Sequence, residues 1–300
     1  MVRALIIANP RARGGRPATI RTVVDALAAA GWSTEAVEAH ERSTIRGLAT
    51  DAVQDGRDIV IAIGGDGTII EAATPLVGTE VSLGIVPAGT GNLLAGNLRI
   101  PLSPAGAARV IVAARTRRVD IGRVDWVDRA RHFVVACGTG FDARVISSTH
   151  PERKRRWGKI AYFGTAIAMG DRLRNVPHVI TIDGERLEID AAEVIIANLG
   201  EIIPNLVRPR LPIVPDDGAF DLIVLRARGP LQGLLGVWET LSHTTSGHHP
   251  GGRLFRVRAK EVRVEASPPQ PVELDGDLQG ETPFTATIIP SAISIIMPRR

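Results

Sequence analysis

The sequence predicts an α/β domain of the Rossmann-like type, followed by a second domain that is β-rich and sandwich-like. In the first third of the chain, two short apolar runs at residues 59–63 and 81–86 each end in a glycine-rich turn that leads into helical apolar spacing. Alternating strands and helices predict a parallel sheet that binds ligands at the carboxyl ends of its strands. From Arg117 onward the helical periods give way to short alternating runs, which indicate β-hairpins.

Apolar periodicity and capping residues define the elements of the first domain. Strands are expected at residues 4–8, 33–39, 59–63 and 81–86. Helices are expected after Thr68 and at residues 17–30, 44–54, 93–98 and 103–114. Two helix starts carry capping signals: Ser103-Pro104 supplies an N-cap and a proline, and Thr68 with Glu71 forms a capping box.

The most informative stretch is residues 58–74, with the sequence DIVIAIGGDGTIIEAAT. A buried strand, a glycine turn and a helix N-terminus form a phosphate site, because glycines let an anion approach backbone N–H groups and the helix adds partial positive charge. No lysine follows, so the pattern is not a P-loop. Asp66 would repel phosphate unless a cation lay between them, which predicts a role through Mg²⁺. The alternative is a strained turn in which Asp66 is a solvated turn residue.

Hairpins and single strands fill the predicted second domain, residues 124–288, whereas the first domain begins at residue 1 and ends at residue 123. Hairpin strands are expected at residues 118–127 with 133–137, within 179–190, and at 254–259 with 262–266. Asp183-Gly184 is the expected turn of the second hairpin. A strand is expected at residues 194–198 and a helix at residues 231–241. His243, His248 and His249 fit no common zinc spacing, which favours a solvent loop.

Length and composition limit the class of protein. Three hundred residues exceed a typical single domain. No apolar run reaches the roughly 18 residues of a membrane span, and we expect no signal peptide. The single cysteine, Cys137, excludes a disulfide framework and fits a reducing cytoplasm. Nearly all of the 36 basic residues are arginine, so the pI of about 9.9 reflects a compositional bias and predicts no nucleic-acid partner.

These motifs resemble the catalytic domain of the diacylglycerol kinase family, which includes the bacterial lipid kinases and the sphingosine kinases. The GGDGT turn carries most of the resemblance, and NAD kinases and 6-phosphofructokinases share versions of it. Further segments match the family pattern: Asn9-Pro10 with Gly14-Gly15, and residues 89–92, 138–143, 216–221 and 275–276. The chain departs from the pattern at Leu93, where many members have an aspartate, and at Asp277, where the family has a glutamate. Residues 204–215 also lack the glycine pair that is usual in the family.

The resemblance implies roles for particular residues. It assigns nucleotide binding to Asn9, Thr44, Gly64, Gly65, Gly67, Thr68, Thr90 and Asn92. It assigns metal binding to Asp66, Asp120 and Asp277, and a structural Mg²⁺ to Asp217 with the carbonyls of Val214 and Ala219. The catalytic residues would be Asp66 and Asp275, with Asp275 as the general base. Thr44 is equally well explained as a helix cap, and Asp120 as a hairpin-edge residue. Asp183-Gly184-Glu185 is closer to the literal family motif, but we read it as a plain turn.

The resemblance implies ATP-dependent, Mg²⁺-assisted phosphorylation of a lipid hydroxyl, for example that of diacylglycerol. Residues 289–300 would return to the first domain as a last strand, and a groove between the domains would hold acyl chains. The basic, aromatic-bearing segment 152–173 is either a membrane-surface helix or a solvated one, so we expect a cytoplasmic protein or one peripheral at the inner face of the membrane. The sequence leaves open whether the protein forms a homodimer. The alternatives are an NAD kinase-like small-molecule kinase and a non-catalytic nucleotide-binding regulator.

Overall fold

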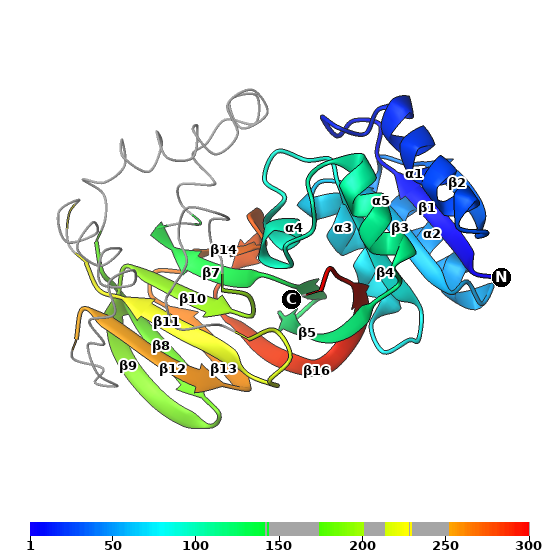
Figure 1. Ribbon diagram of the computed structural model, residues 1–300. Coiled ribbons are helices and arrows are strands. Elements are labelled where there is room, and N and C mark those ends of the chain that lie inside the picture. The colour runs from blue at the N-terminus through cyan, green and yellow to red at the C-terminus, as the bar shows by residue number, and fades with distance from the viewer. Residues whose placement is uncertain (142, 144–173, 201–213, 228, 230–251, 300) are drawn as a thin grey trace. The chain divides into compact units, whose positions relative to one another are not determined.

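The chain folds into two compact units, whose elements are labelled in Figure 1. The computed structural model describes residues 1–141, 143, 174–200, 214–227, 229 and 252–299. The first unit comprises Met1–Asp120 and Ser291–Arg300, and the second comprises Ile121–Pro290. The division expected from the sequence, at residues 123 and 288, remains our proposal for the functional domains.

A parallel sheet forms the centre of the first unit (Figure 1). Its strand order is β2-β1-β3-β4, with β1 at Arg3–Ala8, β2 at Ser33–Glu38, β3 at Ile59–Gly64 and β4 at Ser82–Pro87. Strands β1, β3 and β4 are buried along nearly their whole length, as expected for strands covered on both faces, whereas the edge strand β2 is mostly exposed. The end of β16 (Phe284–Ile296) lies parallel beside β4, so the last strand returns to this unit as predicted.

Helices pack in pairs around this sheet, α1 against α5 and α2 against α3. Their bounds are α1 Pro17–Ala29, α2 Arg42–Gln54, α3 Asp66–Ala73, α4 Leu93–Asn97 and α5 Pro104–Val112. Both α1 and α5 begin at a proline, whose missing N–H is not needed at the first helical position. The predicted N-cap of α5 is confirmed, because the Ser103 hydroxyl accepts the N–H of Gly106 at 3.3 Å.

The predicted capping box at Thr68 and Glu71 is wrong. Helix α3 begins at Asp66, and its N-cap is Gly65, three residues before the predicted Thr68. The Thr68 hydroxyl accepts a hydrogen bond from the Asn9 side chain instead, and the Glu71 carboxylate pairs with an arginine of α2. Tertiary partners therefore take both side chains away from the helix end.

The second unit is a sandwich of two sheets. One is antiparallel with the order β12-β11-β10-β7-β14-β15, at Leu254–Ala259, Phe220–Leu225, Glu193–Ala197, Ala136–Gly140, Pro271–Leu274 and Asp277–Glu281. The other contains the order β16-β13-β8-β9, with β13 at Glu261–Ala266, β8 at Val176–Ile182 and β9 at Glu185–Ala191. Strand β5 (Thr116–Asp125) pairs with β16 and with β6 (Ala130–Phe133).

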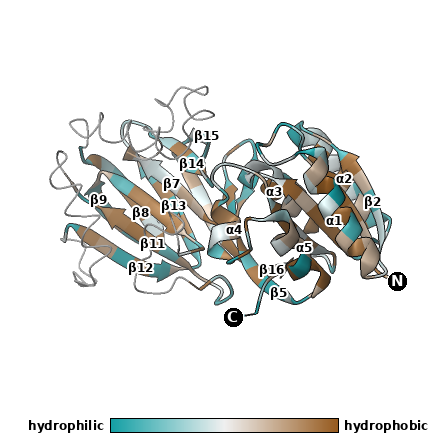
Figure 2. Cartoon of the chain, turned by 45° about the horizontal axis from the view of Figure 1, so that its top comes forward, coloured by the Kyte–Doolittle hydropathy of each residue, from teal (hydrophilic) through white to brown (hydrophobic). Residues whose placement is uncertain are grey.

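Apolar side chains of both sheets share one core, in which the rings of Phe133 and Phe220 stack with centroids 5.4 Å apart. Hydrophobic and hydrophilic residues alternate along several strands, as the colours in Figure 2 show. On β13, for example, Val262 and Val264 are buried while Arg263 is exposed. The period-two pattern that predicted a β-rich second domain is therefore confirmed.

Two aspartate-glycine turns close hairpins in this unit. Asp183-Gly184 joins β8 to β9 as predicted, with φ of 47° and 92°. Asp275-Gly276 joins β14 to β15 with φ of 51° and 86°. Positive φ at both central residues matches the twist of the flanking strands and favours Asp-Gly.

Some predictions concern segments outside the described residues. These are the basic segment 152–173, the irregular stretch 204–213, the helix at 231–241 and the histidine loop with His243, His248 and His249. Within the part of the chain that the structure describes, no helix combines the length and apolar character needed to cross a membrane.

Candidate active site

Three loops meet at the carboxyl edge of the parallel sheet in the first unit, after β1, β3 and β4. The Asn9 side chain donates to the Thr68 hydroxyl at 2.9 Å, which joins the first loop to the GGDGT turn. Backbone hydrogen bonds join Gly14 to Ala88 and Ala88 to Gly64, each at 2.8 Å. The structure thus brings together loops that the sequence assigned to one nucleotide.

Close backbone contact explains the glycines of these loops. A Cβ at Gly89 would lie 2.5 Å from the Cα of Gly65, so the second loop cannot carry a side chain at this contact. A Cβ at Gly65 would lie 3.2 Å from the Cα of Gly89, which is also tight. A Cβ at Gly64 would lie 2.4 to 2.6 Å from side-chain atoms of Thr68. The first-turn N–H groups of α3 have no partner within their own helix and lie at this edge, which suits them to bind an anion.

The second turn is organised by Asn92, which has the left-handed conformation with φ of 49°. Its side chain accepts the N–H of Gly89 at 2.9 Å and donates to the Gly89 carbonyl at 3.0 Å, which closes the loop. Thr90 is exposed at the tip of this loop. Asn92 therefore shapes the loop, and Thr90 is the side chain that a ligand could reach.

Asp66 lies between the two glycine turns and is not a freely solvated turn residue. Its Oδ1 accepts the N–H of Leu94, in the first turn of α4, at 3.1 Å. Burial raises the pKa of Asp66 above its ordinary value, and hydrogen bonds from backbone N–H groups, that of Leu94 foremost, partly oppose this shift. A partly buried carboxylate beside a phosphate-type loop suits Mg²⁺, which binds proteins through one or two carboxylates together with substrate phosphates.

Glu71 is a buried carboxylate whose role the sequence did not indicate. Its Oε2 accepts from Nε and Nη2 of Arg46 on α2 at 3.0 and 2.6 Å, and Arg42 lies 3.8 Å from its Oε1. This pair connects the start of α2, where Thr44 is exposed, to the helix that follows the GGDGT turn. The signal in the sequence was an acidic residue among buried positions of α3, which calls for a cationic partner.

The remaining predicted residue of the first unit, Asp120, is buried on β5. Its Oδ1 accepts the backbone N–H of Ser291 at 2.7 Å. Ser291 has a positive φ of 48° on β16, so Asp120 stabilises the place where the last strand enters this unit. This contact gives Asp120 a structural function whether or not it also takes part in binding metal.

In the second unit, the Asp275 carboxylate is held by three successive backbone N–H groups. Oδ2 accepts from Val134 at 2.9 Å, and Oδ1 accepts from Val135 at 2.7 Å and from Ala136 at 3.1 Å. Asp277 follows as the first residue of β15 and is partly buried. The Asp275-Gly276-Asp277 turn is therefore fixed to the connection between β6 and β7.

The other aspartate-glycine turn has a similar local design. Oδ1 of Asp183 accepts the N–H groups of Lys260 and Glu261 at 2.9 and 2.8 Å. Local geometry therefore does not separate the two turns; what separates them is the segment that each carboxylate holds.

At the proposed structural metal site, the guanidinium of Arg258 already pairs with the Asp217 carboxylate. Oδ2 of Asp217 lies 2.7 Å from Nη2 of Arg258, and Oδ1 accepts the N–H of Ala219 at 3.3 Å. Val214 and Ala219 are partly buried nearby in sequence. Among the described residues, no group of three or more His, Cys, Asp or Glu side chains could hold a metal ion. The Asp217 carboxylate is thus neutralised by Arg258 in this structure.

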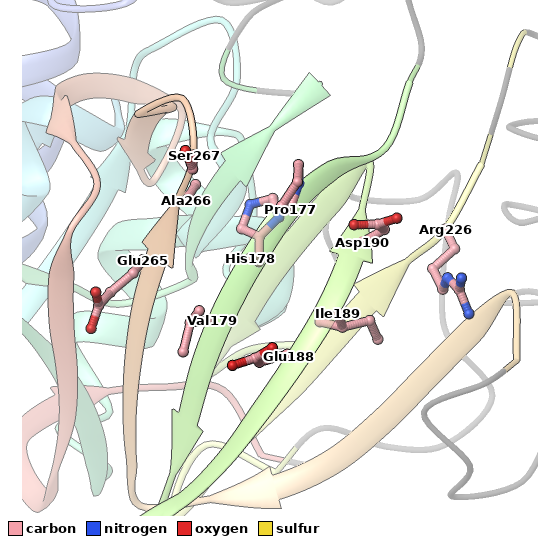
Figure 3. Close-up of a pocket in the computed structure, with 10 residues that line it drawn as sticks. All are labelled: Pro177, His178, Val179, Glu188, Ile189, Asp190, Arg226, Glu265, Ala266 and Ser267. Carbon is pink, nitrogen blue, oxygen red and sulfur yellow. The ribbon is translucent and has the colours of Figure 1, made fainter.

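A separate cavity of about 520 Å³ lies in the second unit, between residues of β8, β9 and β13 (Figure 3). Glu188 and Asp190 of β9 and Glu265 of β13 line it together with His178 and Arg226. None of the predicted site residues lines this cavity, and its three carboxylates disfavour a phosphate ligand.

The raised pKa of Asp66 predicts that Asp66→Asn stabilises the protein at pH 7. The ionised carboxylate is less favourable in the folded than in the unfolded state, and asparagine removes that cost while keeping an acceptor for Leu94. The gain should shrink as the pH falls through the raised pKa toward the ordinary value of 3.8, where both states become protonated. Urea denaturation with a chelator and without nucleotide tests this. A lower free energy of unfolding for the variant at pH 7 would contradict it.

Glu71→Gln should destabilise the protein by about 1 to 3 kcal/mol, because it breaks charged hydrogen bonds to a buried acceptor. Arg42→Gln is the matched control: its guanidinium is more exposed and more distant, and its loss should cost at most about 1 kcal/mol. Denaturation of the two variants side by side measures both values. An equal loss of unfolding free energy in the two variants would contradict a stabilising role for the contact between Glu71 and Arg46.

Comparison with known proteins matches both parts of the chain. Residues 3–124 match the diacylglycerol kinase catalytic domain, and residues 135–297 match the YegS C-terminal NAD kinase beta sandwich-like domain. A Mycobacterium tuberculosis diacylglycerol kinase is 31% identical over 85% of this chain and 81% of its own length. An uncharacterized Synechocystis protein is 28% identical over 81% of this chain, which spans only 56% of that protein.

Solved structures agree with this match. A candidate diacylglycerol kinase from Bacillus anthracis superposes with a TM-score of 0.81 at 25% identity, covering 99% of this chain and 95% of the other. The N-terminal α/β domain and the β-sandwich-like C-terminal domain thus occur together in that protein as they do here. With both domains matched in order, the chain belongs to the diacylglycerol kinase family of lipid kinases.

Proposed function

We propose that the protein transfers the γ-phosphoryl group of ATP to a hydroxyl of a lipid such as diacylglycerol. The observation that carries this proposal is the contact between the two glycine turns after β3 and β4, with Asp66 between them. The first-turn N–H groups of α3 lie at this edge and are suited to bind a polyphosphate beside Asp66. The names of the relatives supply the acceptor class, since several of them are called diacylglycerol kinases.

The first domain would bind the nucleotide. We assign nucleotide binding to Asn9, Gly64, Gly65, Gly67, Thr68, Thr90 and Asn92, together with Thr44 at the start of α2. Phosphoryl transfer needs positioning and charge neutralisation more than covalent chemistry, and the rigid contact between the turns supplies the positioning. Mg²⁺ at Asp66 would neutralise charge on the transferred group. Together with Asp66, we propose Asp120 and Asp277 as metal-binding residues. We propose Asp217 with the carbonyls of Val214 and Ala219 as ligands of a structural Mg²⁺, which would have to displace the Arg258 guanidinium.

The second domain would supply the proton acceptor and the lipid site. We assign Asp275 as the residue that takes the proton of the lipid hydroxyl, because three N–H groups fix its carboxylate in one orientation. The proposed enzyme works in the cytoplasm or at the inner membrane face, where its substrate lies. A homodimer remains open.

Asp66→Asn should leave the fold intact and remove most of the activity, because asparagine keeps the contact to Leu94 but binds Mg²⁺ weakly. The measurement is transfer of labelled phosphate from ATP to diacylglycerol, a sphingoid base, ceramide and NAD, with wild type and variant in parallel. Near-normal turnover of the variant would reject the metal role. Labelling of NAD alone would favour the NAD kinase alternative, and ATP binding without any product would favour a regulator.

Asp275→Asn should lower turnover by roughly 10² to 10⁴, the range typical of a positioned proton acceptor, without loss of ATP binding. Asp183→Asn is the matched control, since this turn has the same local geometry and asparagine tolerates it. Its turnover should stay within a few-fold of wild type. Turnover and ATP affinity of both variants decide the assignment. An inactive Asp183→Asn together with an active Asp275→Asn would contradict the assignment of Asp275 as the proton acceptor.

A further inference from the structure

The bend that receives the Asp275 carboxylate is itself held from its other side. Val134 and Val135 connect β6 to β7 and are both buried. Their N–H groups, with that of Ala136, all point to Asp275. Successive N–H groups directed at one carboxylate form an anion-binding concavity. The position of Asp275 is therefore only as well defined as the position of this bend.

Asn198 holds the carbonyl side of the same bend. This asparagine is completely buried, directly after β10, and its Nδ2 donates to the Val134 carbonyl at 2.9 Å. The backbone N–H groups of Asn198 and Leu199 donate to the Val135 carbonyl at 2.9 and 3.0 Å, and the N–H of Asp275 donates to the Ala136 carbonyl at 2.9 Å. The bend is thus held by Asp275 through its N–H groups and by Asn198 through its carbonyl groups.

We propose that Asn198 is a positioning residue for the reaction, which acts by fixing residues 134–136 and through them the Asp275-Gly276-Asp277 turn. The inference rests on the proposed function, because it gives that turn a part in catalysis. The Asn198 amide also contributes to stability, because an apolar side chain here would leave the buried Val134 carbonyl without this donor. The amide is needed to satisfy the Val134 carbonyl while the Val134 N–H stays directed at Asp275.

Asn198→Ala should lower kcat by about 10- to 100-fold, because small displacements of a reacting group have effects of this size, and should leave the KM for ATP unchanged. Thr139→Val is the matched control. Thr139 is equally buried in the same sheet, and its hydroxyl donates one hydrogen bond to a backbone carbonyl, that of Pro271, at 2.8 Å. It does not contact residues 134–136 through that bond. The melting temperature should fall by a similar amount in both variants, whereas kcat should fall only in Asn198→Ala.

A double-mutant cycle separates positioning from a general structural effect. If Asn198 acts through Asp275, adding Asn198→Ala to Asp275→Asn should lower kcat little further. Independent, multiplying losses would overturn the proposal, as would equal losses of kcat in Asn198→Ala and Thr139→Val. If Asn198→Ala does not fold, Asn198→Ser serves in its place. Its shorter side chain does not reach as far as the Asn198 amide, so kcat should again fall, and wild-type kcat would overturn the proposal. Should Asp275→Asn itself retain normal turnover, the proposed function of Asp275 fails, which is a different result.

Discussion

The contact between two glycine-containing turns governs the first unit. Strands β3 and β4 are neighbours in a parallel sheet, so the chains that leave their carboxyl ends emerge side by side. Side chains at Gly65 or Gly89 would force these turns apart, and their absence allows backbone to touch backbone. The first-turn N–H groups of α3 then lie at this edge, whereas Asn92 accepts the N–H of Gly89 within the second turn. The register of β3 and β4, the glycines and the start of α3 therefore together determine how closely the two turns can approach each other.

The two carboxylates of α3, Asp66 and Glu71, are compensated to different degrees. Glu71 is compensated by Arg46, so its burial adds a tie between α2 and α3. For Asp66, burial is the largest influence on the pKa and raises it, although backbone N–H groups donate to the carboxylate. Burying a charge is costly unless it is paired. The two acids lie five residues apart on one helix and differ in how their charge is compensated, which supports the proposed metal role of Asp66.

How well the sequence predicted each part depended on how local the determining contacts are. The strand, glycine turn and helix start around residues 58–74 are neighbours in sequence, so the phosphate-type edge was predictable. The capping roles predicted for Thr68 and Glu71 were wrong because their partners, Asn9 and Arg46, come from other parts of the chain. Strand alternation predicted the β-rich second unit, since burial on one face imposes period two on every strand. No local pattern indicated Asn198 or the three N–H groups around Asp275, which lie about 140 residues from it.

The two aspartate-glycine turns show why this limit matters for function. Both have positive φ at both central residues, and in both the aspartate accepts backbone N–H groups of a distant segment. Asp183 caps the start of β13, near residues that are exposed on the outer side of the unit. Asp275 instead binds a buried bend that is supported by a fully buried amide. A rigid, doubly supported carboxylate is what positioned proton transfer requires, because a mobile acceptor would lose the advantage of proximity. The choice of Asp275 as the proposed proton acceptor thus rests on the buried bend that its carboxylate binds, a contact that the sequence of the turn itself does not reveal.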